Sequence, residues 1–333
     1  MLNNVTVTRN DNSQVVTTTG GWYTNNQVTF TMPLSAVTAI PTYTNAKTAA
    51  AGLSINMLTN GTKEATIPAD VQSFKVYDDG GANGYNSLEC DGTLILTAPS
   101  GYGFQLSGST SFYSSASLTV YDSNGADDNK KEYDTGSSGH NGDIPIIYAR
   151  SGYMTLHYET STNYEGLDLT VTPIELATAR SITVNKTGNG TVTVNPASAK
   201  PFDEVTLTAT PATSNLLCSL TVKDADNQDV ALSEDLLWYT GKSSATFTMP
   251  LTAVTVAPTF TNTLTADGGL YVNMPTEGSK TVTIPDGVTS FKVYDDGGKD
   301  GECSYNCDGT LVLTAPEGKG LLLEGGYDLS INS

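Results

Sequence analysis

The chain repeats itself at a distance of 217 residues, and this repeat constrains its possible folds more than any other feature. Residues 28–99 match residues 245–316 without a gap, so that Thr29-Phe-Thr-Met-Pro-Leu34 returns as Thr246-Phe-Thr-Met-Pro-Leu251. A period this long exceeds the roughly 20–50 residues of solenoid repeats, so each period holds whole domains, most simply two small ones. The chain is therefore predicted to be part of a modular array, with a function in surface display and binding.

Composition narrows the classes of partner. Asp and Glu outnumber Lys and Arg 35 to 16, which gives a formal net charge of -19. This field repels nucleic acid and anionic membranes and favours cations or neutral ligands. No apolar run approaches the length of a transmembrane helix, so no membrane insertion is predicted within the segment. Met1 is not followed by a signal peptide, and a signal for export is expected upstream.

Alternating apolar and hydroxyl residues indicate half-buried strands with many Val, Ile and Thr. The clearest runs are Val5-Thr-Val-Thr8, Ser181-Ile-Thr-Val-Asn185, Gly190-Thr-Val-Thr-Val-Asn195, Val205-Thr-Leu-Thr-Ala209 and Ser279-Lys-Thr-Val-Thr-Ile284. Turn signals are predicted between strands at Thr187-Gly-Asn-Gly190, Asn60-Gly61, Asp286-Gly287 and Asp308-Gly309. The predicted fold class is all-β, with tandem small β-sandwich and β-rich repeat modules and very little helix.

The repeat also predicts the module boundaries. Residues 180–262 form one complete repeat module, and residues 1–45 match only its second part. Residues 48–174 form a complete sandwich module, and residues 265–333 match only its first part. Incomplete sheets at both ends would expose unpaired edges and half a core, which is unfavourable for an isolated chain. The sequence is therefore expected to be an excerpt of a longer polypeptide.

The sandwich module resembles a bacterial CUB-like domain. The likeness is carried by four landmarks in order: Phe74-Lys-Val-Tyr-Asp-Asp-Gly-Gly81, Cys90-Asp-Gly-Thr-Leu-Ile-Leu-Thr-Ala-Pro99, Leu118-Thr-Val-Tyr-Asp122 and Gly166-Leu-Asp-Leu-Thr170. The resemblance implies a jelly-roll β-sandwich that serves extracellular proteins as a binding or spacer module. Residues 180–262 resemble a bacterial surface-repeat module of the internalin B-repeat-like kind, through Gly188-Asn-Gly-Thr-Val-Thr-Val194 and Phe247-Thr-Met-Pro250. Such modules are structural or adhesive.

Calcium is the cation to consider, because many CUB domains hold one. The positions that would inherit two of its ligands are Phe112 and Ala116, neither of which can bind a metal. The remaining acidic candidates are the Asp-Asp-Gly-Gly turns, each with a further Asp across the predicted hairpin. These metal candidates are Asp78, Asp79 and Asp91 in the first copy and Asp295, Asp296 and Asp308 in the second. The alternative is that each Asp caps a turn, with Gly taking positive φ.

The cysteines depart from the CUB pattern. The family would pair Cys90 or Cys307 with a cysteine just before the Gly-Gly, where this chain has Asp79 and Asp296. Cys303 lies four residues before Cys307 and pairs with it only if the turn brings their Cα atoms within about 7 Å. Cys90 and Cys218 are interpreted as buried free thiols that pack as small hydrophobes.

The only two tryptophans are each followed by a tyrosine: Trp22-Tyr23 and Trp238-Tyr239. An exposed pair would suit stacking on a sugar ring, whereas a pair on a β element also packs one ring inward. Both interpretations stay open at this stage. As ligand-binding candidates the four aromatic residues imply an extracellular glycan or protein surface as partner.

No motif for catalysis is present: the chain has two histidines and lacks a Gly-x-Ser-x-Gly elbow, HExxH, a P-loop and a dinucleotide fingerprint. The prediction is a non-catalytic extracellular segment of a bacterial surface or secreted protein that acts as spacer or adhesive modules, without a cofactor. The alternative is the carbohydrate-binding accessory region of a secreted polysaccharide-degrading enzyme.

Overall fold

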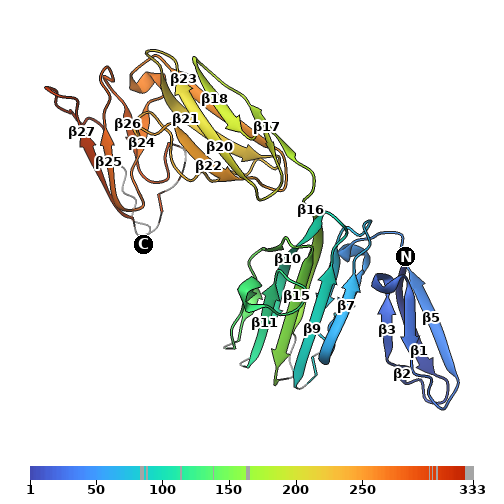
Figure 1. Ribbon diagram of the computed structural model, residues 1–333. Coiled ribbons are helices and arrows are strands. Elements are labelled where there is room, and N and C mark those ends of the chain that lie inside the picture. Colours follow the sequence, from blue (N-terminus) through green and yellow to red (C-terminus); the bar gives the residue numbers. More distant parts are fainter. Residues whose placement is uncertain are drawn as a thin grey trace. The chain divides into compact units, whose positions relative to one another are not determined.

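The computed structural model describes residues 1–82, 86–87, 89–112, 115–137, 139–162, 166–299, 301, 303–304 and 307–326, leaving out the side chains of residues 3 and 4. The chain forms two compact units, which divide between Ala177 and Thr178. Over the described residues the regular structure is strand with four single-turn 3-10 helices: η1 (Trp22–Thr24), η2 (Ala49–Ala51), η3 (Asp128–Lys130) and η4 (Ala266–Gly268). The all-β prediction is confirmed (Figure 1). No helix within these residues has the length and apolarity to cross a membrane.

The sandwich module of the first unit consists of two facing sheets. The first has the order β13-β10-β16-β8-β6, and β14 also pairs with β10. Its strands are β6 (Ser54–Asn56), β8 (Phe74–Tyr77), β10 (Tyr102–Ser111), β13 (Asn141–Asp143), β14 (Ile147–Ala149) and β16 (Leu167–Glu175). The second sheet has the order β12-β11-β15-β9-β7. Its strands are β7 (Asn60–Thr66), β9 (Cys90–Thr97), β11 (Ala116–Tyr121), β12 (Lys131–Asp134) and β15 (Tyr153–Thr160).

Strand alternation builds the core between these sheets. Along β9 the residues at even positions are buried and those at odd positions are not, so Leu94 and Leu96 point inward while Asp91 and Thr93 do not. Leu106 of the facing sheet is likewise fully buried. Burial of one such side chain stabilises the fold by about 1.5–3 kcal/mol.

Two predicted turns are wrong. Asn60-Gly61 begins strand β7, and Asp308-Gly309 begins strand β27 (Asp308–Thr314). The strands β7 and β9 run parallel, so no hairpin joins them. The glycine of the Asp-Gly pair is needed for a different reason: a Cβ on Gly92 would lie 2.1 Å from the carbonyl oxygen of Leu58, and one on Gly309 would lie 1.6 Å from that of Pro275. Asp-Gly here permits close approach of two backbones.

The repeat module of the second unit also has two sheets, in the orders β19-β17-β23-β21 and β18-β20-β22. The strands are β17 (Arg180–Val184), β18 (Gly190–Asn195), β19 (Ser198–Ala199), β20 (Glu204–Pro211), β21 (Leu216–Asp224), β22 (Ser244–Thr248) and β23 (Val254–Thr261). The sandwich segment that follows has the parallel pairs β24-β26 and β25-β27. Its other strands are β24 (Tyr271–Asn273), β25 (Glu277–Thr283) and β26 (Lys292–Tyr294). These pairs repeat β6-β8 and β7-β9 of the first unit.

The first 45 residues form the sheets β2-β1-β5 and β3-β4. Their strands are β1 (Leu2–Arg9), β2 (Val15–Val16), β3 (Thr18–Gly21), β4 (Gln27–Phe30) and β5 (Val37–Tyr43). This segment leaves apolar side chains exposed to water. Met32 is 60% exposed and Tyr43 is 73% exposed, whereas their counterparts Met249 and Phe260 are 0% and 4% exposed. Met249 packs in a cluster with residues of β20, a strand that has no counterpart in residues 1–45.

Candidate functional sites

Each tryptophan joins a repeat segment to the sandwich that follows it in the chain. The indole of Trp22 is 1% exposed, and its Nε1 donates a hydrogen bond to the main-chain oxygen of Ser54 at 3.1 Å. Trp238 is 7% exposed, and its Nε1 donates to the main-chain oxygen of Tyr271 at 3.2 Å. Ser54 and Tyr271 are equivalent positions of the two copies. The two contacts are therefore the same contact made twice.

The aromatic packing around the two indoles is also the same. Trp22 meets Phe74 edge to face at 5.2 Å between ring centroids, and Trp238 meets Phe291 at 5.5 Å. Each tryptophan further makes a T-shaped contact with the tyrosine that follows it. Such pairs contribute about 0.5–1.5 kcal/mol beyond the burial of their area. We call each of these contact sets a joint. Stacking on a sugar needs an exposed ring face, which neither indole has, so the packing interpretation accounts for both tryptophans.

The tyrosines differ between the joints. Tyr239 is buried, donates from its hydroxyl to Asp235 at 2.5 Å, and receives a hydrogen bond from Lys280 Nζ at 3.1 Å. The same ammonium lies 4.7 Å from the centroid of its ring. Burial, together with the hydrogen bond to Asp235, raises the pKa of Tyr239 well above its usual value. Tyr23 is half-buried. Asp235 lies four residues before Tyr239, and the residue four positions before Tyr23 is Thr19, so the first joint has no carboxylate at this position.

Asp78 links two strands of one sheet. Its side chain is 1% exposed and accepts hydrogen bonds from the main-chain N–H groups of Gly80, Gly166 and Leu167 at 2.8–3.1 Å. Burial raises the pKa of Asp78 despite these donors. The carboxylate thus ties the turn after β8 to the beginning of β16. Its counterpart Asp295 accepts from the N–H of Gly297 at 3.0 Å and is exposed.

The second Asp of the motif holds the following loop and the strand cysteine. Asp79 accepts from Thr59 Oγ1 at 2.8 Å, from the N–H of Ser87 at 3.0 Å and from Cys90 Sγ at 3.4 Å. Burial raises the pKa of Asp79, but the hydrogen bonds from Ser87 and Thr59 outweigh it and hold the pKa below its usual value. Burial and the nearby Asp79 charge raise the pKa of Cys90 to about 12. The thiol is therefore protonated at neutral pH.

The second copy repeats this arrangement. Asp296 accepts from Thr276 Oγ1 at 2.9 Å, from the N–H of Ser304 at 3.2 Å and from Cys307 Sγ at 3.3 Å. In both copies a thiol-to-carboxylate hydrogen bond occupies the place where the resemblance would put a disulfide. Cys303 and Cys307 are both free and exposed, and Cys90 and Cys218 are free and buried, as expected for the latter two.

The structure does not gather the predicted metal ligands. Asp91 points outward from β9 and pairs with His157 Nε2 at 2.8 Å, while Asp78 faces the protein interior. Asp308 is exposed at the start of β27. Over the described part of the chain, no three His, Cys, Asp or Glu side chains converge as a metal site. Each Asp of both Asp-Asp-Gly-Gly turns accepts at least one hydrogen bond from a nearby main-chain N–H group, which fits the turn interpretation.

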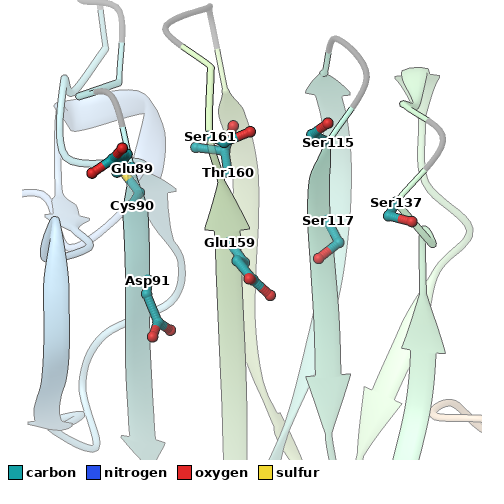
Figure 2. Close-up of a pocket in the computed structure, with 9 residues that line it drawn as sticks. All are labelled: Glu89, Cys90, Asp91, Ser115, Ser117, Ser137, Glu159, Thr160 and Ser161. Carbon is teal, nitrogen blue, oxygen red and sulfur yellow. The ribbon is translucent and has the colours of Figure 1, made fainter.

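A polar hollow lies over one end of the five-stranded sheet of the first sandwich, with a volume of about 490 Å³. Figure 2 shows its side chains on neighbouring strands, with Asp91, Glu159 and Ser117 next to one another. The hollow is lined by Glu89, Cys90, Asp91, Ser115, Ser117, Ser137, Glu159, Thr160 and Ser161. Hydroxyls and three carboxylates dominate this lining, and it has no Lys or Arg. Such a surface suits a neutral polyhydroxyl ligand rather than an anion.

Sequence reasoning missed most of this hollow. Its serines lie on strands that are far apart in the chain, and no spacing links Ser117 to Asp91. The sequence does show which side chains of each strand point outward, because side chains alternate between the two faces of a strand. The outward positions on β9, β11 and β15 lie side by side once the strand order is known. The strand order is a property of the fold and is not written in any local pattern.

No protein-family profile matches the chain, and no curated protein matches it. Among solved structures it is similar to the full extracellular region of zebrafish Gpr126/Adgrg6, with 12% identity and a TM-score of 0.24. The match covers 52% of this chain and 23% of that one. A likeness this loose carries no argument about fold or function.

Proposed function

We propose that the chain is a non-catalytic spacer segment of an extracellular bacterial surface or secreted protein, in which modules are joined in pairs. The observation that supports this proposal most strongly is the joint. A buried indole, its hydrogen bond to a main-chain oxygen and its edge-to-face partner recur at both places where a sandwich follows a repeat segment. A chain built for spacing benefits from fixed joints, because a fixed joint transmits direction from one module to the next.

The acidic composition supports the same proposal. A net charge of -19 keeps such a chain soluble and away from anionic surfaces. Repetition of the modules would strengthen weak adhesive binding, because linking the sites raises the effective concentration of each site for the same partner. The resemblance to surface-repeat modules agrees with an exported location. Labelling of intact source cells with an antibody to residues 48–262 tests the location, and a signal that requires permeabilised cells would contradict it.

Pulling the full chain by its two ends in a single-molecule force experiment tests the spacer function. We expect two principal unfolding events, one for each compact unit. The first unit should release roughly 600 Å of chain, at up to about 3.6 Å per residue. Trp22→Ala should split this event into separate smaller ones, while Tyr43→Ala, at an exposed position of the same segment, should not. Extension without resolved events, or four events in the parent chain, would contradict paired modules.

A second candidate function is glycan binding by an accessory region of a polysaccharide-degrading enzyme. The hollow around Asp91 and Glu159 favours it, because hydroxyls and carboxylates are the groups that hydrogen-bond sugar hydroxyls. A glycan array probed with the full chain is the test. Binding that falls in Glu159→Gln and persists in Glu204→Gln, an exposed change in the repeat module, would support it. Absence of signal on plant and host glycans would remove this candidate.

A further inference from the structure

The two joints differ in which module is complete. In the first, residues 1–45 lack counterparts of β17, β18 and β20, yet Trp22 is seated on a full sandwich. In the second, the repeat module is complete, and the sandwich segment lacks counterparts of β10, β11, β15 and β16 over its described residues. The elements missing from either side are therefore not needed for the joint. Both joints share two parts. One is the Trp-Tyr-Thr turn, at residues 22–24 and 238–240, and the other is the first part of the sandwich, from β6 to β8 in the first copy and from β24 to β26 in the second.

The shared part of the sandwich forms a socket for the indole. Its apolar residues recur in both copies and are buried in the same hydrophobic cluster as the tryptophan. The equivalent pairs are Leu53 and Leu270, Ile55 and Val272, Ala65 and Val282, Ile67 and Ile284, and Val71 and Val288. Phe74 and Phe291 complete the socket as the edge-to-face partners. All five pairs are apolar and three are identical, while the other two change volume in opposite directions, because Val272 is smaller than Ile55 and Val282 is larger than Ala65.

One polar contact of the socket recurs as well. Lys63 Nζ donates to the main-chain oxygen of Asn56, and Lys280 Nζ donates to that of Asn273. Burial lowers the pKa of Lys63, and it lowers that of Lys280, where the Asp235 charge acts in the opposite direction. The same lysine thus has the same backbone partner in both sandwich copies, and in the second it also donates to Tyr239 of the joint. The tyrosine network with Asp235 belongs to the second joint and is an addition to the common contact.

We propose that the Trp-Tyr turn and the socket are an interchangeable docking surface, so that a repeat module from either copy seats on the sandwich of the other. The partner of the socket is thus any second copy of the repeat module, and the partner of the turn is any copy of the sandwich. A complete repeat module like 180–262, placed directly before a complete sandwich like 48–174, would then form a pair in which both cores are closed. This inference deepens the proposed spacer function. The docking itself does not depend on that function, but its use in the array does.

Two reciprocal replacements in the full chain test the docking surface. In the first, residues 1–45 are replaced by a copy of residues 178–262, and the native Trp238 is changed to Phe. In the second, residues 178–262 are replaced by a copy of residues 1–45, and the native Trp22 is changed to Phe while the transplanted Trp22 is kept. The junctions keep their local sequence, because Thr44-Asn45 and Thr261-Asn262 are equivalent. Each protein then has one tryptophan, placed at the hybrid joint.

The readout is quenching of that tryptophan by acrylamide. We expect the blue-shifted emission and low quenching of a buried indole in both hybrids, equal to those of the parent chain with the matching single tryptophan. Phe74→Ala in the first hybrid and Phe291→Ala in the second should each raise the quenching several-fold. An indole quenched like free tryptophan in either hybrid, while circular dichroism still shows parental strand content, would overturn the proposal. Force spectroscopy tests the spacer function separately, since hybrids can dock whether or not the array bears load.

Discussion

Replacement of Trp22 by alanine is the sharpest test of the reasoning about the joints. The indole is 1% exposed, and a buried aromatic side chain of this kind removes about 150–250 Å² from water. At about 25 cal/mol per Å² this corresponds to about 4–6 kcal/mol, close to the ~3–5 kcal/mol typical of Trp→Ala in a core. The change also leaves the main-chain oxygen of Ser54 without its indole donor. We expect the first unit to lose about 3–5 kcal/mol, a large part of the ~5–15 kcal/mol of a typical domain.

Urea unfolding of the full chain measures this effect. With an m-value of about 1–3 kcal/mol per M, the midpoint of the first unit should fall by ~1 M or more. Far-UV circular dichroism follows both units, and the remaining Trp238 follows the second unit alone. Trp22→Phe keeps an aromatic ring and removes the N–H donor, so a smaller loss of about 1–3 kcal/mol is expected.

Tyr43→Ala is the matched control, because Tyr43 is in the same segment and 73% exposed. Its effect should stay within ~0.5 kcal/mol. The reasoning is refuted if Trp22→Ala leaves the circular dichroism midpoint in place. It is refuted equally if the Trp238 transition moves as far as that of the first unit, because the two units would then unfold as one.

Three further predictions concern the acidic turns and the second joint. Asp78→Asn should cost about 1–3 kcal/mol by chemical denaturation, because one carboxylate oxygen accepts from Gly80 and the other from the buried N–H groups of Gly166 and Leu167, whereas an amide offers only one acceptor oxygen. The exposed Asp295→Asn should cost much less, and equal losses would contradict this. Asp79 has a lowered pKa in the folded chain, so its ionised form stabilises the fold above the ordinary pKa of 3.8, and this stabilisation is lost as the pH falls below that value. In Asp79→Asn the free energy of unfolding should therefore decrease less steeply with falling pH. An unchanged pH dependence at acid pH would count against the hydrogen bonds described. Burial raises the pKa of Cys90 to about 12, so iodoacetamide at about pH 8 should label the exposed Cys303 in the folded chain and Cys90 only after unfolding. Peptide mass spectrometry measures the labelling of each cysteine. Rapid labelling of Cys90 in the folded chain would refute its burial.

Sequence patterns predicted the strands far better than the turns. The alternating runs around Val192 and Leu207 became β18 and β20, since side-chain alternation is a local property that the backbone geometry imposes directly. The Asp-Gly pair at 308–309 was misread as a turn, because the same dipeptide also serves where two backbones pass within contact distance. That use of glycine depends on a neighbour far away in the chain, and no local pattern records it.

For the candidate sites, the sequence by itself determined which residues are rare and repeated: the two Trp-Tyr pairs, which lie 216 residues apart, and the Asp-Asp-Gly-Gly turns, which lie 217 residues apart. It left open whether the indoles face solvent or a neighbouring module. Only the tertiary structure decided this, by placing Trp22 against Phe74 and Trp238 against Phe291. The physical reason is that strand alternation specifies two faces of a strand but not which other segment covers them. Which segment buries a given face is decided by long-range packing, and here the sandwich that follows each tryptophan in the chain buries the indole.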